Sequence, residues 1–237
     1  MQKISRRAFT WSTAALLAAP ALAARTGGRV PKNLDHIILG CTDLDEGIEF
    51  VFRKLGVRAS PGGVHPGAGT MNALLSLGTL RYLEIISPDP SQPNAVDSRF
   101  LRTLNHPALV GWAQHRRHLE ELAGALRAAG IDYTGPAPGS RQRPDGSVLN
   151  WKSLPLKDDE NGILPFFIEW GASTVHPSLD SPKGCSIDSL EITAQDPAPL
   201  AALDKQLDLD VAIRQSKATR LAARLHGPAG SLILQSR

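Results

Sequence analysis

The chain has 237 residues, of which 42% are hydrophobic, and a formal net charge of +3 at pH 7. Lys3, Arg6 and Arg7 account for this whole charge, because the first 23 residues contain no acidic residue, and the remainder of the chain is therefore near neutral. No later block of Lys and Arg with interleaved aromatic residues is present, which argues against nucleic acids and acidic membranes as partners.

The first 23 residues have the pattern of a twin-arginine export signal. Paired arginines in residues 5–10 precede a short apolar stretch, residues 11–19, and the Ala-Leu-Ala of residues 21–23 fits a cleavage site. The apolar stretch is shorter than the roughly 20 residues that span a bilayer, and Pro20 interrupts it. We therefore expect a cleaved signal, with no membrane association afterwards, and a soluble protein located in the periplasm.

A first module is predicted at about residues 34–88. The apolar run at residues 34–41 indicates a strand, and Thr42 or Asp43 then caps a helix that continues through Leu55 and ends at Gly56. Three further strands are predicted around Arg58, at residues 72–77 and at residues 81–87, separated by turns rich in Gly and Pro. The predicted module is therefore βαβββ.

The same order recurs at about residues 108–171. An apolar run at residues 108–112 is followed by an amphipathic helix at residues 118–129, with Gly130 as its stop, and by strands near residues 148–154 and 164–170. The segment that ends the first module, Tyr82 to Ile85, corresponds to residues 167–170 apart from a shift of one residue. This correspondence predicts a second copy of the module.

A third, degenerate βαβββ module is predicted at residues 184–236. It has a strand at residues 186–192, a helix capped at Asp196 that reaches Leu207, and an apolar final strand at residues 231–234. Its first strand aligns Asp188 and Ser189 with Asp35 and His36, so the histidine is missing from this copy.

Cys41 and Cys185 are the only cysteines in the sequence. An oxidising periplasm would permit a disulfide between them, and two unpaired buried thiols are an equally good interpretation.

Tandem βαβββ modules with His on the first strand and Glu on the last resemble the vicinal-oxygen-chelate (VOC) superfamily, and more closely its glyoxalase-like branch. The resemblance is carried by residues 34–37 (Leu-Asp-His-Ile), 62–65 (Gly-Gly-Val-His), 69–72 (Gly-Thr-Met-Asn), 82–84 (Tyr-Leu-Glu), 139–146 and 164–170. It implies an α+β fold in which paired modules form a curved, cup-like mixed sheet around a metal or a ligand. It does not imply one reaction, because isomerases, epimerases, lyases, dioxygenases and metal-free binders share this scaffold.

Glutamates on the last strands are the first candidates for chemistry. Alternation along a strand gives Glu84 apolar neighbours, and a carboxylate there is costly unless it is paired or bound to a metal; Glu169 repeats the pattern. Together with His36, these glutamates predict a site for divalent Fe, Mn, Zn or Ni, as the resemblance also implies. The alternative is a core histidine held by backbone groups, with both glutamates paired to arginines.

The second module has no histidine at the position that the resemblance implies, since Val110, Gly111 and Trp112 stand there. His65 could complete the set, or water could occupy open positions, while Met71 stands where many relatives carry His. We expect Glu84 and His65 to move the proton in catalysis.

Four residues are candidates for substrate binding: Asn72, Arg143, Trp151 and Trp170. A planar guanidinium suits a carboxylate or an enediolate-like group, and the two tryptophans could wall a pocket. For Arg141, in the same expected loop as Arg143, we favour a solvated surface position.

The resulting functional hypothesis is a metal-dependent enzyme that acts on a small α-keto, diol or carboxylate metabolite by Lewis-acid polarisation of vicinal oxygens. The alternative is a metal-free protein that binds or sequesters a small molecule with the same fold. Domain-exchanged dimers are frequent in similar folds, so we also expect a homodimer.

Overall fold

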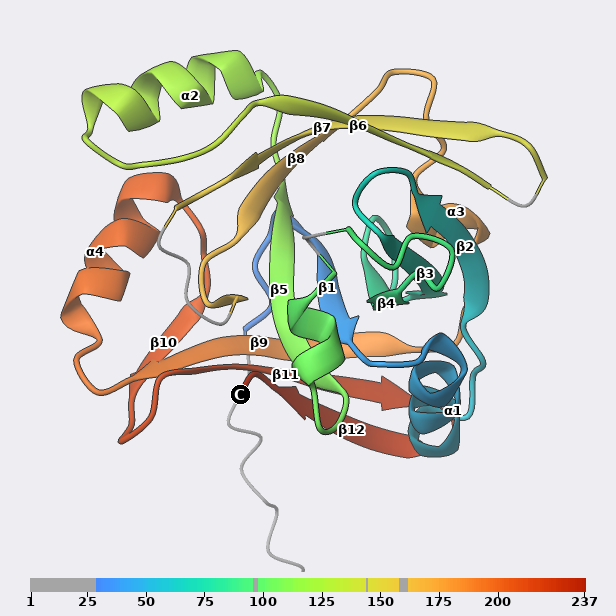
Figure 1. Cartoon of the computed structure of the whole chain (residues 1–237). Coiled ribbons are helices and arrows are strands. Elements are labelled where there is room, and N and C mark those ends of the chain that lie inside the picture. Colours follow the sequence, from blue (N-terminus) through green and yellow to red (C-terminus); the bar gives the residue numbers. More distant parts are fainter. Residues whose placement is uncertain (1–28, 96–97, 144, 158–161) are drawn as a thin grey trace, which may run out of the picture.

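The computed structural model describes residues 29–95, 98–143, 145–157 and 162–237, so the predicted export signal lies outside the described residues. The described residues form one eight-stranded and one four-stranded β-sheet, with helices packed against them (Figure 1). Within these ranges no helix is long and apolar enough to cross a membrane.

The first module has the predicted element order. Its elements are β1 (Leu34–Gly40), α1 (Leu44–Leu55), β2 (Ser60–His65), β3 (Thr70–Ser76) and β4 (Tyr82–Pro88). Asp43 caps α1 by accepting a hydrogen bond from the backbone N–H of Glu46, and Gly56 follows the helix with a φ of 79°, a left-handed conformation that glycine adopts readily. Both predicted helix ends are confirmed, because they depend only on local backbone chemistry.

The second module repeats this order with one strand that the sequence did not reveal. Its elements are β5 (Ala108–His115), α2 (Leu119–Ala128), β6 (Ala137–Gln142), β7 (Val148–Pro155) and β8 (Phe166–Trp170), and two short helical segments, η1 (Phe100–Thr103) and α3 (Pro177–Asp180), lie outside it. Strand β6 occupies part of the expected loop at residues 139–146 and, among the described strands, pairs only with β7. An edge strand tolerates Pro and Gly and needs no apolar alternation, so its sequence is typical of a loop.

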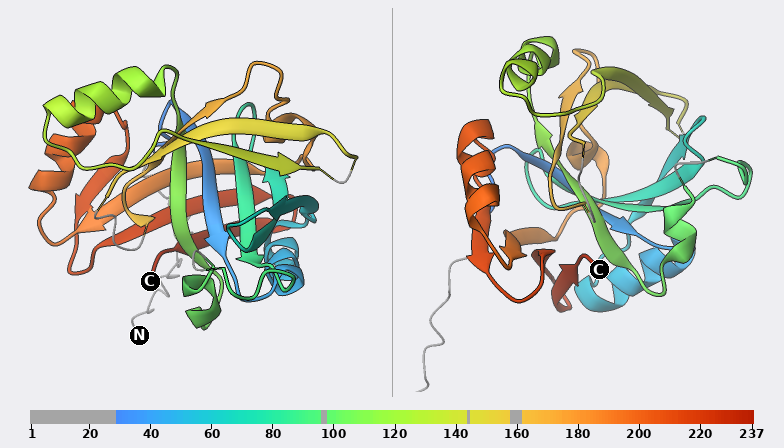
Figure 2. Two further views of the ribbon diagram at one scale, coloured as in Figure 1. Left: turned by 45° about the horizontal axis from the view of Figure 1, so that its top comes forward. Right: turned by 60° about the vertical axis from the view of Figure 1, so that its left-hand side comes forward.

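Both modules contribute to the eight-stranded sheet, whose order is β2-β3-β4-β1-β5-β8-β7-β6. In each module the first and last strands pair in parallel, and the antiparallel pair β1–β5 joins the modules. The edge strands β2 and β6 approach closely, since a side chain at Gly62 or Gly63 would collide with Arg141 or Gln142. The sheet is therefore curved and nearly closed (Figure 2), which confirms the predicted α+β, cup-like VOC fold.

The third segment has the predicted order of elements along the chain, but its strands lie in the sheet in a different order from those of the first two modules. Its elements are β9 (Ser186–Ala194), α4 (Ala198–Leu207), β10 (Ala212–Gln215), β11 (Arg220–Gly227) and β12 (Gly230–Gln235). The sheet order is β10-β9-β11-β12, so β10 pairs in parallel with the first strand, whereas in the other modules the last strand does so. The segment packs on α1, where the backbone N–H of Ala229 donates to the carbonyl of Leu55, and it shares one hydrophobic core with the cup.

Cys41 and Cys185 are both free and buried, so the interpretation as two separate thiols agrees with the structure. Burial and the nearby carboxylates of Asp43 and Glu46 raise the pKa of Cys41 to about 12, and burial raises the pKa of Cys185.

These two thiols are expected to resist alkylation in the folded protein. The thiolate is the nucleophile, and at neutral pH Cys41 carries roughly three orders of magnitude less thiolate than an unperturbed cysteine. Mass spectrometry after iodoacetamide treatment should show no native labelling and two labels after denaturation in urea. Equal labelling rates for Cys41 in the native and denatured protein would contradict the buried position.

Candidate functional site

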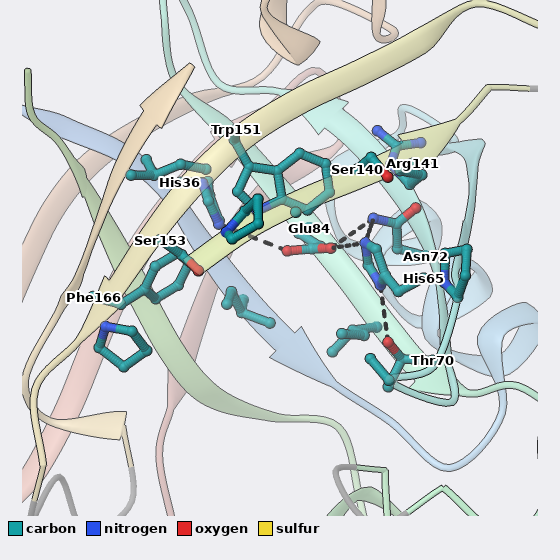
Figure 3. Close-up of a pocket in the computed structure, with 18 of the residues that line it drawn as sticks. His36, His65, Thr70, Asn72, Glu84, Ser140, Arg141, Trp151, Ser153 and Phe166 are labelled. Carbon is teal, nitrogen blue, oxygen red and sulfur yellow. Dashed lines mark hydrogen bonds and ion pairs between the residues drawn. The ribbon is translucent and has the colours of Figure 1, made fainter. Parts of the chain in front are cut away.

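A cavity of about 810 Å³ lies inside the curved sheet, on the face shown in Figure 3. Both modules line it, through β1, β2, β3 and β4 on one side and β6, β7 and β8 on the other, whereas the four-stranded sheet contributes no lining residue among those described. A cavity of this size suits a small organic ligand. The cup therefore provides the candidate site, and the third segment only supports it from outside.

Glu84 lies at the centre of the first module's wall. Its side chain points from β4 into the cavity, together with Tyr82 and Ile86, as strand alternation predicts, and it is only 7% exposed. Asn72 donates a hydrogen bond from Nδ2 to Oε1 of Glu84 at 2.6 Å. The Nε2 atoms of His36 and His65 each lie 3.7 Å from a Glu84 oxygen, too far for a hydrogen bond but close enough for electrostatic coupling.

Both imidazoles are fixed through their other nitrogen. Nδ1 of His36 lies 2.7 Å from Oδ1 of Asp35, and Nδ1 of His65 lies 2.8 Å from Oγ1 of Thr70. Each ring therefore turns its Nε2 atom towards Glu84 (Figure 3). The structure thus brings together four of the residues selected from the sequence, namely His36, His65, Asn72 and Glu84.

The sequence reasoning missed the role of Asp35. A β-bulge between Leu34 and His36 inserts Asp35 as an extra residue, so its side chain can turn to the same side as His36. The carboxylate is 1% exposed and accepts a hydrogen bond from Trp170 Nε1 at 2.9 Å. It also lies 3.2 Å from His176 Nε2. The signal for this role in the sequence was an acidic residue next to a histidine within an apolar strand.

The surroundings of Asp35 keep it ionised. Burial by itself raises the pKa of this carboxyl, but the interactions with the imidazoles of His115, His176 and His36 outweigh burial and hold the pKa well below its usual range. An ionised Asp35 accepts the Nδ1 proton of His36 and so sets the tautomer and orientation of that ring.

Glu169 is not part of this cluster, contrary to the expectation of a shared metal site. Its carboxylate accepts hydrogen bonds from the backbone N–H groups of His118 and Leu119, at 3.0 and 3.3 Å, at the N-terminus of α2. Phe166, Ile168 and Trp170 line the cavity instead. The shift of one residue between the two copies is the reason, because neighbouring residues on a strand face opposite sides.

Neither arginine of this segment lies where the sequence predicted it. Arg143 forms an ion pair with Asp180, donates to the carbonyl of Val175 and is not among the residues that line the cavity. Arg141, expected on the surface, is 4% exposed and lines the cavity from β6. The reason is again an unrecognised strand, since β6 turns alternate side chains inward and brings Arg141 against β2.

Trp151 and Trp170 line the cavity as expected. Their ring centroids are 5.7 Å apart in an edge-to-face arrangement, so they form one continuous aromatic wall opposite Glu84.

The side chains around Glu84 are of the types that bind divalent metals, but they are not arranged as a metal-binding site. In the part of the chain that the structure describes, no group of three or more His, Cys, Asp or Glu side chains could hold a metal ion. Glu169 faces away, Ile168 occupies the inward position on β8, and the amide nitrogen of Asn72 contacts both Glu84 and His65. A metal would require Asn72 to release Glu84.

The environment of His65 predicts a dependence of stability on pH. Burial, with the charges of Arg141 and His36, lowers its pKa from 6.5, while Glu84 opposes this effect. The unfolded chain therefore binds the proton more readily, and the stability contributed by neutral His65 is lost as the pH falls below about 6.5. Thermal unfolding between about pH 7.5 and 5.5 should show a smaller fall in Tm for His65→Gln than for the parent. Equal slopes would contradict the burial effect.

Comparison with known proteins agrees with this architecture. Residues 34–207 match the family described as glyoxalase-like domain. No curated protein matches the sequence. A hypothetical protein from Staphylococcus aureus has a similar structure, with a TM-score of 0.59 and 17% sequence identity over 85% of this chain and 84% of that chain, which supports the fold.

Two epimerase structures are also similar over part of the chain. The methylmalonyl-CoA epimerase from Mycobacterium tuberculosis has a TM-score of 0.43 and 24% identity over 58% of this chain and 87% of that chain. The Streptomyces coelicolor methylmalonyl-CoA epimerase has a TM-score of 0.44 and 23% identity over 60% and 97%. The family match covers both modules of the cup and the strand and helix that follow them, and the chain therefore belongs to the glyoxalase-like domain family.

Proposed function

We propose that this protein is an enzyme that transfers a proton at a carbon atom next to an oxygen function in a small α-keto, diol or carboxylate metabolite. The observation that carries the proposal is the buried Glu84 carboxylate, which points into the cavity between two imidazoles and is fixed by Asn72. A carboxylate that is positioned by its neighbours, nearly buried and directed into a cavity has the properties of a general base.

The hydrogen bonds around Glu84 give its two oxygens different roles. Oε1 accepts from Asn72 and is occupied, whereas Oε2 faces His36 at 3.7 Å and is the oxygen available to take a proton from a ligand. His36 is held by ionised Asp35, so its Nε2 atom is in position to exchange that proton with Glu84 after a small movement. His65, with its lowered pKa, is neutral and accepts from Asn72.

The opposite wall controls the environment of the reaction. Trp151, Trp170 and Phe166 present apolar surface to the cavity and would exclude water around a bound ligand. Weak solvation strengthens the electrostatic interaction between Glu84 and the developing charge on the substrate.

A metal-dependent form of this activity is the second candidate, with Fe, Mn, Zn or Ni as expected from the sequence. One observation favours it: the Nε2 atoms of His36 and His65 converge on Glu84, and a carboxylate stands behind His36, as behind many metal-bound histidines. A bound metal would supply Lewis-acid polarisation of vicinal oxygens.

Hydrogen exchange at carbon tests the proposal directly. The protein is incubated in D₂O with a panel of α-keto acids, hydroxy acids and diols, and deuterium incorporation at carbon is followed by NMR. Parallel samples are treated with EDTA or supplied with Fe, Mn, Zn or Ni, and metal content is measured. Exchange that persists after EDTA supports the first candidate, and exchange that returns only with one metal supports the second. Tight binding without any exchange would instead identify a binding protein.

We also propose that the protein is exported to the periplasm, on the basis of residues 1–23. We further propose that it assembles as a homodimer, on the basis of its fold. Replacing both Arg6 and Arg7 with Lys should retain the protein in the cytoplasm of a bacterial host. Light scattering of the purified protein measures its oligomeric state.

A further inference from the structure

Two buried polar atoms near Glu84 have no hydrogen-bond partner within the described chain. They are Nη1 of Arg141 and Oδ1 of Asn72, on side chains that are 4% and 3% exposed. Both side chains line the cavity (Figure 3). Because an unpaired buried polar atom is costly, these two atoms indicate a ligand that supplies the missing partners.

The two atoms, on side chains of β3 and β6, lie close together against strand β2. A Cβ atom on Gly62 would lie 2.8 Å from Nη1 of Arg141 and would overlap Oδ1 of Asn72, so both atoms pack against the Gly62 backbone. Figure 3 shows Arg141 and Asn72 next to each other, on one side of Glu84. One atom is a donor and the other is an acceptor, so a complementary ligand group needs both an acceptor and a donor.

The charge of Arg141 makes the acceptor on the ligand an anion. Arg143, two residues further along, already pairs with Asp180, whereas Nη1 of Arg141 is unpaired at the cavity wall. Burial lowers the pKa of Arg141, and the nearby Glu84 opposes this effect. A guanidinium in a buried position is stabilised by a carboxylate that it can bind directly.

We propose that Arg141 and Asn72 bind a hydroxy acid, with its carboxylate accepting from Arg141 Nη1 and its neighbouring hydroxyl donating to Asn72 Oδ1. This inference rests on the proposed function, since it names the substrate class for the same cavity. The Asn72 amide that holds the hydroxyl also donates to Glu84, so binding places the hydroxyl-bearing carbon beside the base. The aromatic wall of Trp151 and Trp170 then faces the rest of the ligand.

Calorimetry with three matched probes tests this site without turnover. Mandelate carries the carboxylate, the hydroxyl and an aromatic group; mandelamide lacks the charge, and phenylacetate lacks the hydroxyl. Mandelate should bind the full-length protein about 10-fold or more tightly than mandelamide, and measurably more tightly than phenylacetate. Equal affinities for mandelate and mandelamide, or no mandelate binding up to its solubility limit, would overturn the proposal.

Variants assign the two preferences to their residues. Arg141→Gln should abolish the preference for mandelate over mandelamide, and Asn72→Ala should abolish the preference for mandelate over phenylacetate. Arg143→Gln is the matched control, because it removes an equal charge from outside the cavity and should leave both preferences unchanged. Unchanged preferences in Arg141→Gln would refute the assignment, and the comparison of probes on the parent protein stands even if a variant fails to fold.

The binding experiment and the deuterium-exchange experiment can fail independently of each other. Mandelate binding that depends on Arg141, without deuterium exchange, would retain the hydroxy-acid site and reject the enzyme. Exchange on an α-keto or diol compound with no Arg141-dependent binding of mandelate would retain the enzyme and reject the site.

Discussion

Replacing Glu84 with glutamine is expected to lower the rate of deuterium exchange by about 10²- to 10⁴-fold, the usual contribution of a positioned general base. Glutamine retains the size of the side chain and can still accept the Asn72 hydrogen bond through its carbonyl oxygen, but it cannot take a proton from carbon. Exchange rates from NMR and the Tm of the variant are the measurements, and the Tm should remain close to that of the parent.

The matched control is Glu169→Gln. Glu169 lies on the last strand of the second module, as Glu84 lies on that of the first, but its carboxylate caps α2 outside the cavity. This change should leave the exchange rate unaltered and lower the unfolding free energy by about 0.5–1 kcal/mol, through the weakened interaction with the helix N-terminus. A comparable loss of exchange in both variants would contradict the role given to Glu84 alone.

Replacing Asp35 with alanine is expected to lower the unfolding free energy by about 3–5 kcal/mol, as when one partner is removed from a buried charged network. The change removes the acceptor for Trp170 Nε1 and the partner of His36 Nδ1 and His176 Nε2. These nitrogens are buried or partly buried, so water replaces the lost carboxylate poorly. Urea unfolding followed by tryptophan fluorescence measures the difference.

Two comparison variants test whether the loss of stability in Asp35→Ala comes from the buried network around Asp35. Asp188→Ala changes the aligned position on the first strand of the third segment, which is exposed, and should alter stability by no more than about 0.5 kcal/mol. Asp35→Asn retains one acceptor oxygen and should lose less stability than Asp35→Ala. If Asp35→Ala were as stable as the parent, the buried network would not be a major source of stability.

The sequence by itself determined the features that depend on local chemistry. The caps of α1, at Asp43 and Gly56, follow from side-chain acceptors and left-handed backbone freedom; Gly56 was predicted, and Asp43 was one of the two residues predicted for the N-terminal cap. The order of helix and strands in the first module and the apolar strands of the second follow from periodicity. Two repeated modules of this kind were enough to predict the curved sheet and its glyoxalase-like family.

Only the tertiary structure decided which side chains share the cavity. Glu84 and Glu169 look equivalent in sequence, yet a shift of one residue turns Glu169 to α2, and strand pairing alone fixes that register. Arg141 became a cavity residue because β6 pairs with β7 and approaches β2, contacts between segments far apart in the chain. Asp35 joined His36 through a bulge that pairing with β5 imposes. Local propensity determines the elements, whereas register, bulges and edge contacts are long-range properties, and these position the chemistry.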